Sequence, residues 1–326
     1  MKNKDFLTSP NLKIWSKIGM RAAFGLISIE MHKIDKNFFV VTGDVSTSAG
    51  LDRFRKNYPE NYIDVGIAEQ NLLGIAAGLA SEGHNVFTTT FAPFQTMRCC
   101  EQIKVNLGYM KQKVCMIGLA SGLVLGTLGY THCCIEDIGV LRSIPNLNII
   151  SPADSGELAK ALIAAKENKN STYIRLTGSS NLNQIYTEDY DFSIGKSITL
   201  REGKDIALIA TGSLVGEAIK CASLLEGDNI SCEVVNFHTI KPIDFKKIEE
   251  LSKKFKTIIT LEEHNIIGGL GSAVAEVLSK VKSSTQQLFF GVNDTYSEGG
   301  EYEYLLDKFS LNANRVYEKI KYLNER

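Results

Sequence analysis

Strand-like and helix-like segments alternate along most of this chain, and the alternation constrains the fold more than any other feature. Apolar runs bounded by turn residues predict strands at 37–42, 86–90, 114–119, 147–150 and 173–176. Helical patterns fall between them, notably at 67–81, 94–107 and 155–167. This order favours a parallel sheet with helices on its faces.

A polar, turn-rich stretch at 177–204 interrupts the alternation, and we interpret it as a connection between domains. A second series follows it, with strands at 205–210, 231–236, 257–261 and 287–292 and helices near 214–225, 245–254 and 271–280. The 326 residues also exceed the usual size of one domain. We therefore predict an α/β fold with two domains, 1–190 and 195–326, each a mostly parallel sheet flanked by helices.

Composition narrows the class of protein. A formal net charge of -1 argues against nucleic acid or a membrane surface as the main partner. No stretch approaches the ~20 apolar residues of a membrane-spanning helix, and the first residues lack a signal-like apolar run, so we expect a cytoplasmic protein. The seven cysteines show no C-x-x-C spacing, which favours reduced, mostly buried thiols and no metal site on this chain.

The stretch GIAEQNLLGIAAGLA at 66–80 places a single carboxylate, Glu69, at the start of an otherwise uncharged helix. The pattern leaves no polar face, which predicts burial in a core or between subunits. Gly74 and Gly78 lie one turn apart, where another backbone could approach closely. Glu69 could simply stabilise the helix N-terminus through the helix dipole. Alternatively, it faces a ligand nitrogen in a water-poor interface, where a charge-assisted hydrogen bond contributes most.

On this motif the chain resembles the transketolase superfamily of thiamine diphosphate enzymes, and the resemblance covers nearly the whole sequence. It is most similar to the C-terminal half of a split transketolase, which implies a pyrimidine-binding domain followed by a transketolase C-terminal domain. In that family the matching glutamate hydrogen-bonds N1′ of the cofactor's aminopyrimidine ring and promotes the imino tautomer that activates the cofactor. Such proton sharing needs a desolvated carboxyl group in a fixed position, which Glu69 can provide.

Ligands of open α/β sheets bind beyond the carboxyl ends of the strands. Asp44 and Ser48 follow the first predicted strand, Phe91 and Phe94 follow the second, and Arg175 lies near the end of the fifth. We expect these residues, far apart in sequence, to converge on one edge of one sheet.

The resemblance assigns roles to several of these positions. In the family, the motif matching FAPF supplies an aromatic side chain that stacks on the aminopyrimidine, so Phe94 is the first candidate and Phe91 the second. Asp44 matches an acid of the pyrimidine-binding domain. The stretch GTLGYTHCC resembles a turn whose histidine points at the donor sugar, which makes His132 a predicted catalytic residue. The alternative is that the phenylalanines and His132 are ordinary structural residues.

Arg21, Ser48 and Arg175 are plausible matches for the side chains with which transketolases hold a sugar phosphate. The alternative for each arginine is a salt bridge at the surface or an interface. Two positions depart from the family pattern, because Leu128 replaces an acid and Ala120 replaces a histidine. We therefore expect a different donor, for example a modified or nucleotide-linked sugar.

The chain lacks the Gly-Asp-Gly motif through which the family holds the diphosphate and Mg²⁺. Gly-Asp occurs only at Gly43-Asp44 and Gly227-Asp228. The glycine-rich GGLGSA at 268–273 could bind an anion, but it lacks the lysine of a P-loop, so packing or a helix start explains it better. We therefore expect an N-terminal partner subunit that carries GDG and binds the diphosphate and Mg²⁺, self-association to an α2β2 assembly, and two-carbon ketol transfer between sugars.

Three other functions fit parts of the pattern. The β subunit of a 2-oxo acid dehydrogenase has a similar length and fold. Deoxyxylulose phosphate synthase shares the GIAEQN and GYTH features but is normally one long chain that contains GDG. A non-catalytic paralogue that regulates or scaffolds a partner would retain the fold without the activity.

Overall fold

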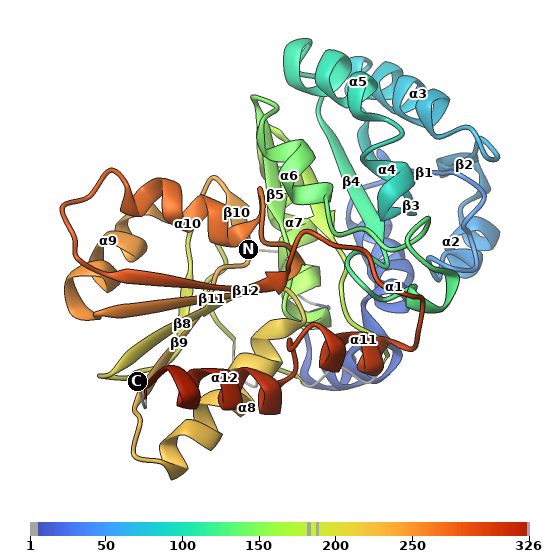
Figure 1. Cartoon of the computed structure of the whole chain (residues 1–326). Coiled ribbons are helices and arrows are strands. Elements are labelled where there is room, and N and C mark those ends of the chain that lie inside the picture. The colour runs from blue at the N-terminus through green and yellow to red at the C-terminus, as the bar shows by residue number, and fades with distance from the viewer. Residues whose placement is uncertain (1–5, 181–183, 187–188, 325–326) are drawn as a thin grey trace.

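The computed structural model describes residues 6–180, 184–186 and 189–324, which form two mostly parallel sheets flanked by helices (Figure 1). The strands of the first sheet are β1 (Phe38–Thr42), β2 (Tyr62–Asp64), β3 (Asn85–Phe91), β4 (Val114–Leu119), β5 (Leu147–Ile150), β6 (Ser171–Arg175) and β10 (Thr239–Lys241). Their order is β10-β5-β6-β4-β3-β1-β2, and all neighbours are parallel except β10 and β5. The two-domain α/β prediction is confirmed.

Helices cover both faces of the first sheet because its strands are apolar on both sides. One face packs on α1 (Ser9–Ile34), which kinks at Gly19, and on α7 (Ser155–Glu167). The other face packs on α3 (Glu69–Ser81), on η3 (Ile103–Tyr109) and on α6 (Asp137–Arg142). Along β1, Val40 belongs to the first core and Val41 to the second, as the two-residue repeat of a strand requires. The short α2 (Asp52–Asn57) packs beside α1.

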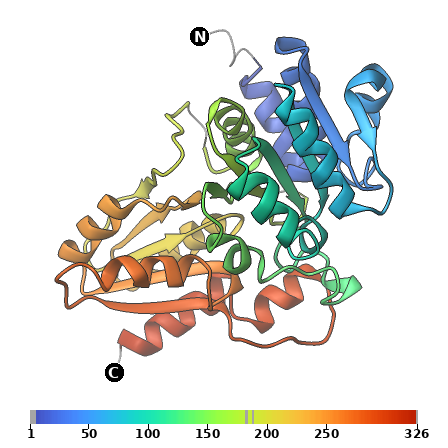
Figure 2. The same ribbon diagram turned by 90° about the horizontal axis from the view of Figure 1, so that it is seen from above.

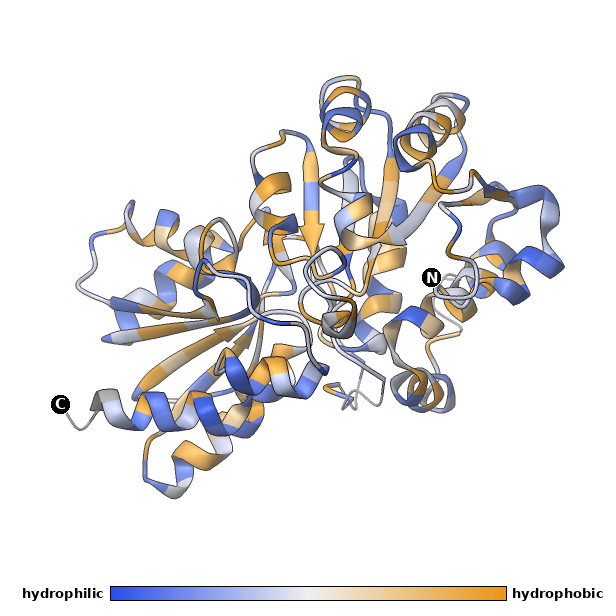
Figure 3. Cartoon of the chain, turned by 45° about the vertical axis from the view of Figure 1, so that its right-hand side comes forward, coloured by the Kyte–Doolittle hydropathy of each residue, from blue (hydrophilic) through white to orange (hydrophobic). Residues whose placement is uncertain are grey.

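The second sheet contains β7 (Ile198–Arg201), β8 (Ile206–Ala210), β9 (Cys232–Asn236), β11 (Thr257–Asn265) and β12 (Gln286–Val292), in the order β12-β11-β8-β9-β7. One face is covered by α8 (Leu214–Gly227), α11 (Tyr302–Lys308) and α12 (Ala313–Asn324), and the other by α9 (Phe245–Lys254) and α10 (Leu270–Leu278). Figure 2 shows the two domains side by side from above, and Figure 3 shows apolar strands between helices whose outward faces are hydrophilic.

Two strands, β10 and β7, were not among the predicted strands, and β10 joins the two domains. β10 follows the second domain's β9 in the chain, yet it pairs antiparallel with β5 of the first sheet. The predicted connection 177–204 contains β7, which forms the antiparallel edge of the second sheet. Within the described part of this connection, Tyr186 and Tyr190 stack and both hydroxyls donate to the buried Glu157 of α7. Residues 181–183 and 187–188 lie outside the described part, and the domain boundary near 190 stays a prediction.

One predicted helix needs correction, and another is partly exposed. The helix expected at 94–107 is divided into α4 (Ala92–Gln95), a turn at 96–99, α5 (Cys100–Gln102) and the π-helical η3. The helix α3 has an exposed face formed by Gln70, Asn71, Gly74 and Gly78, so it is not fully buried in this chain's own core, and its burial between subunits stays a prediction. Among the described residues, no helix combines the length and apolar character needed to span a bilayer.

Candidate active site

Glu69 is the first residue of α3, and its side chain is 4% exposed. Backbone contacts around the carboxyl ends of β1 and β2 fix this position. The Asp64 carboxylate accepts hydrogen bonds from the backbone N–H groups of Asp44 at 2.9 Å and Gly66 at 3.0 Å. A Cβ atom on Gly43 would lie 3.4 Å from Cγ of Glu69. The ends of both strands therefore meet at the start of α3.

The Glu69 carboxylate forms an ion pair with Arg98, whose Nη1 lies 2.8 Å from Oε2. The same guanidinium lies over the ring of Phe94, with Cζ 4.0 Å from the ring centroid. One planar cation thus contacts a buried carboxylate and an aromatic face at once. Sequence reasoning missed Arg98, although its spacing of four residues from Phe94 was visible within the expected helix.

Phe91, Phe94 and His132 form a cluster of rings. The centroids of the two phenylalanines are 6.4 Å apart, and His132 lies 6.1 Å from Phe91 and 5.4 Å from Phe94, all in edge-on arrangements. Nδ1 of His132 lies 3.0 Å from Oγ1 of Thr131, and the imidazole is half-buried. The structure therefore brings together three of the predicted residues from β3, α4 and the turn before α6, and the Arg98 contact joins them to Glu69.

The chemistry of these side chains fits the aminopyrimidine ring of thiamine diphosphate. A flat heteroaromatic ring requires an aromatic face and a carboxyl group that can share a proton with a ring nitrogen. Phe94 provides the face, Glu69 provides the carboxyl group, and the planar guanidinium of Arg98 already makes both kinds of contact. The residues present are thus compatible with the cofactor's ring.

Asp44 and Ser48 follow β1, Arg21 lies in α1, and all three are outside this cluster. Asp44 is exposed and has φ of 57°, and Ser48 is exposed in the following loop. That loop packs on α1, because a Cβ atom on Gly50 would lie 2.9 Å from Cα of Ala22, the residue after Arg21. Burial lowers the pKa of Arg21. Within the described residues, none of the three forms a hydrogen bond or ion pair with Glu69 or His132 through its side chain.

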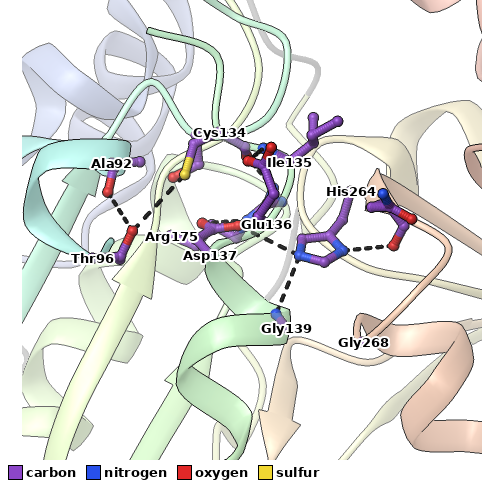
Figure 4. A network of polar contacts seen from close by, with 12 residues as sticks. Ala92, Thr96, Cys134, Ile135, Glu136, Asp137, Gly139, Arg175, His264 and Gly268 are labelled. Carbon is purple, nitrogen blue, oxygen red and sulfur yellow. Dashed lines mark hydrogen bonds and ion pairs between the residues drawn. The ribbon is translucent and has the colours of Figure 1, made fainter. Parts of the chain in front are cut away.

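Arg175 does not lie in this site, and the phosphate contact expected for it needs correction. Its side chain is 1% exposed, and Nε donates to both carboxylate oxygens of Asp137 at 3.0 and 2.8 Å (Figure 4). Its Nη2 donates to the backbone oxygens of Cys134 at 3.3 Å and Glu263 at 2.7 Å. A guanidinium enclosed in this way has no exposed donor for a substrate phosphate, so Arg175 holds the domains together instead.

Carboxylates of β11 extend this interdomain network. The buried Glu263 accepts hydrogen bonds from the backbone N–H of Leu123 in the first domain at 2.7 Å and from the Tyr302 hydroxyl at 2.7 Å. Burial lowers the pKa of His264 to about 4, and its Nε2 accepts from the backbone N–H of Gly139 at 3.3 Å (Figure 4). These contacts fix the orientation of the second domain against α6.

The glycine-rich stretch at 268–273 begins α10, and its N-terminus binds an anion from the chain itself. Glu262 accepts hydrogen bonds from the backbone N–H groups of Leu270 at 2.6 Å and Gly271 at 2.8 Å. A Cβ atom on Gly269 would lie 1.9 Å from Oε2 of Glu262, which explains the glycine. The stretch is therefore a helix start closed by Glu262.

The cysteines of the described residues are unpaired thiols, and burial raises the pKa of Cys99 to about 12. Six of the seven lie in the interior, and Cys100 is half-buried. Over the same residues, no three His, Cys, Asp or Glu side chains are grouped so that they could hold a metal ion.

Two family models match the chain. The pyrimidine binding domain of transketolase matches residues 16–182, and the C-terminal domain of transketolase matches residues 195–316. A putative transketolase C-terminal section from Methanocaldococcus jannaschii is 37% identical over 310 residues, which cover 93% of this chain and 96% of that protein. A 6-deoxy-6-sulfo-D-fructose transketolase subunit from Clostridium sp. is 34% identical over 307 residues, or 94% and 95% of the two chains.

A solved structure described as a split gene transketolase, inactive beta4 tetramer, superposes with a TM-score of 0.84 at 34% identity and covers 93% of this chain and 97% of that one. Fold and comparisons agree on the class, a two-domain α/β chain of a thiamine diphosphate-dependent family. The chain belongs to the transketolase family and corresponds to the C-terminal subunit of a split transketolase.

Proposed function

We propose that this chain is the C-terminal subunit of a thiamine diphosphate-dependent transketolase that transfers a two-carbon ketol unit between sugars. The observation that carries the proposal is the buried Glu69 carboxylate at the start of α3, which the Arg98 guanidinium links to the face of Phe94. A buried carboxylate is costly without a partner; Arg98 supplies that partner in the single chain, and a ligand nitrogen that shares the proton of Glu69 would supply it in the loaded site.

Each residue of the site has a separate task. Glu69 holds a proton at a ring nitrogen, and its low exposure keeps water from competing for that proton. Phe94 fixes the plane of the ring by stacking, and Phe91 supports His132 at the edge of the cluster. When bound, thiamine diphosphate supplies the electron sink for cleavage and formation of the carbon–carbon bond. His132 lies next to Phe94 and can donate a proton to a substrate oxygen.

An N-terminal partner subunit would bind the diphosphate and Mg²⁺. Support comes from the absence of GDG in this sequence and from relatives that are described as a C-terminal section and as a subunit. The structural relative is described as an inactive beta4 tetramer, which fits a subunit that needs a partner for activity. We propose an α2β2 assembly in which α3 contributes to the contact between copies.

The donor is proposed to be a modified sugar. Leu128 stands where the family pattern has an acid and is 55% exposed, while Ala120 replaces a histidine and is buried. An apolar side chain in place of a charged one changes which sugar substituents can be bound. The Clostridium relative is described as acting on 6-deoxy-6-sulfo-D-fructose, so a homologous subunit is described as using a modified ketose.

The test is to purify this chain with a GDG-bearing partner and to screen ketose donors, both plain and modified, with an aldose acceptor. Mass spectrometry of the products should show a two-carbon transfer by the pair and none by either chain alone. Decarboxylation of 2-oxo acids instead of ketol transfer would favour the dehydrogenase alternative. Tight, stoichiometric binding of thiamine diphosphate and Mg²⁺ to this chain alone in calorimetry would contradict the division of the site between two subunits.

A further inference from the structure

Arg98 lies in the turn between α4 and α5, and its main chain is held from two sides. Its backbone N–H donates to the carbonyl oxygen of Pro93 at 3.3 Å. Its carbonyl oxygen accepts from Nε2 of Gln70 in α3 at 3.3 Å. The turn is therefore fixed to α4 and α3 together, and the side chain reaches both Glu69 and Phe94 from this anchored position.

We infer that Arg98 occupies the place of the cofactor's aminopyrimidine ring in the unloaded subunit and has to leave it before the ring can bind. The inference rests on the proposed function. Guanidinium and aminopyrimidine are both flat groups with N–H donors, and each would use the carboxylate of Glu69 and the adjacent face of Phe94. With Cζ of Arg98 4.0 Å from the Phe94 centroid, a second flat group has no room on that face.

The two partners of the ion pair differ in their access to water. Because of this difference, departure of Arg98 is linked to binding of the cofactor ring. The Arg98 side chain is 42% exposed, whereas that of Glu69 is 4% exposed. Arg98 can rotate into solvent, where its charge is well hydrated. Glu69 cannot follow and would remain a buried, uncompensated charge unless a ring nitrogen replaces the guanidinium. Arg98 therefore covers the site until the cofactor takes over both of its contacts.

Competition of this kind multiplies the cofactor affinity by the fraction of molecules in which the site is open, so a mostly closed site has a raised apparent Kd. In the complex with the partner subunit, we expect Arg98→Ala to decrease the Kd of thiamine diphosphate about tenfold in calorimetry at saturating Mg²⁺, an order of magnitude for a site that is mostly closed. Arg98→Gln can still donate a hydrogen bond to Glu69 but carries no charge, so it should give a smaller decrease in Kd. This variant replaces Arg98→Ala in the test if the alanine variant does not fold. The matched control is Arg55→Ala, which removes an exposed arginine whose ion pair with Asp52 lies in α2.

Displacement can also be observed directly by ¹⁵N NMR of the arginine side chains. The Nε–H signal of Arg98, assigned by its loss in Arg98→Lys, should show a ring-current shift from Phe94 in the free complex and lose it on saturation with cofactor. A shift that persists at saturation would overturn the inference. So would an unchanged or increased Kd in both Arg98→Ala and Arg98→Gln, provided that the wild type binds. Absence of cofactor binding to wild type and variants alike would overturn the proposed function and this inference with it.

Discussion

Arg175 and Asp137 form a fully buried ion pair in which one Nε–H makes a bifurcated hydrogen bond to both carboxylate oxygens, at 3.0 and 2.8 Å. The Tyr173 hydroxyl donates to the same carboxylate at 2.7 Å, and Nη2 of Arg175 reaches the carbonyl oxygen of Glu263. The pair thus joins β6, α6 and β11. The position of the second domain against the first therefore depends on a buried ion pair. If one partner is removed, water cannot reach the other to hydrate its charge.

Arg175→Ala should therefore destabilise the chain strongly. Removing one partner of a buried pair leaves the Asp137 charge uncompensated, which typically costs about 3–5 kcal/mol. Urea unfolding of the variant should show this loss. Arg315→Ala, which removes a solvent-exposed pair with Asp307, should leave the stability nearly unchanged. A stable Arg175→Ala enzyme with a raised donor KM would restore the phosphate-binding hypothesis.

Much of the fold could be predicted because its signals are local. The strands β4 and β5 and the helices α7 and α9 lie at the predicted bounds, since each is an uninterrupted apolar or amphipathic run between turn residues. The break at 96–99 had no such signal, because no glycine or proline marks it. It begins at Thr96, whose hydroxyl bonds back to the carbonyl oxygen of Ala92 and whose φ of -110° and ψ of -74° depart from regular helical values.

The residues of the candidate site that lie in local sequence motifs could also be predicted. Glu69, Phe94 and His132 lie in short motifs, and the structure places the latter two in one ring cluster. Arg98 and Asp137 were missed because their charged partners, Glu69 and Arg175, are distant in sequence, and a single sequence does not reveal which charges meet. Arg175 was misassigned for a related reason. The rule for strand ends identifies the edge of a sheet, but the direction of a side chain depends on what packs above it.

Stability should depend on pH through His264. Burial lowers its pKa to about 4 from 6.5, so the unfolded state takes up a proton between these values while the folded state does not. The stability that neutral His264 contributes is present above pH 6.5 and is lost as the pH falls toward 4, by about 2 kcal/mol at pH 5. Glu262 has the opposite effect. Burial raises its pKa to about 7, so the folded state takes up a proton on Glu262 before the unfolded state does, and this contributes stability as the pH falls below 7.

The difference between wild type and His264→Gln separates these two contributions. Urea unfolding at pH 7.5 and pH 5 should show the wild type losing about 2 kcal/mol relative to the variant across this interval. Parallel pH profiles of the two proteins would contradict the assignment to His264.

The exposed face of α3 should mediate self-association. A Cβ atom on Gly74 or Gly78 would meet nothing within 4 Å in the single chain, so lysine at either position is compatible with the fold. In an assembly that packs through this face, Gly78→Lys should lower the mass measured by light scattering. Gly227→Lys, at an equally open helical glycine in α8, should leave it unchanged. A wild-type chain that is monomeric both alone and with its partner would remove this interface.

His132 should act on the reacting substrate more than on its binding. Because its ring lies 5.4 Å from Phe94 and is half-buried, His132→Ala should lower kcat by about 10²-fold or more and change the donor KM much less. Steady-state kinetics of the subunit pair provides the test. An increase in KM with unchanged kcat would assign His132 to substrate binding alone.

We propose that Glu69 shares a proton with the cofactor, and Glu69→Gln in the complex with the partner is the sharpest test of this role. Glutamine keeps the shape and a hydrogen bond but cannot share a proton, so kcat should fall by about 10²- to 10⁴-fold. The decisive measurement is the rate of hydrogen–deuterium exchange at C2 of bound thiamine diphosphate, recorded together with the melting temperature. Slow exchange in a complex of normal stability is the predicted result. Near-normal exchange with a lowered melting temperature would show that Glu69 only stabilises the start of α3, and it would contradict the proton-sharing role of Glu69.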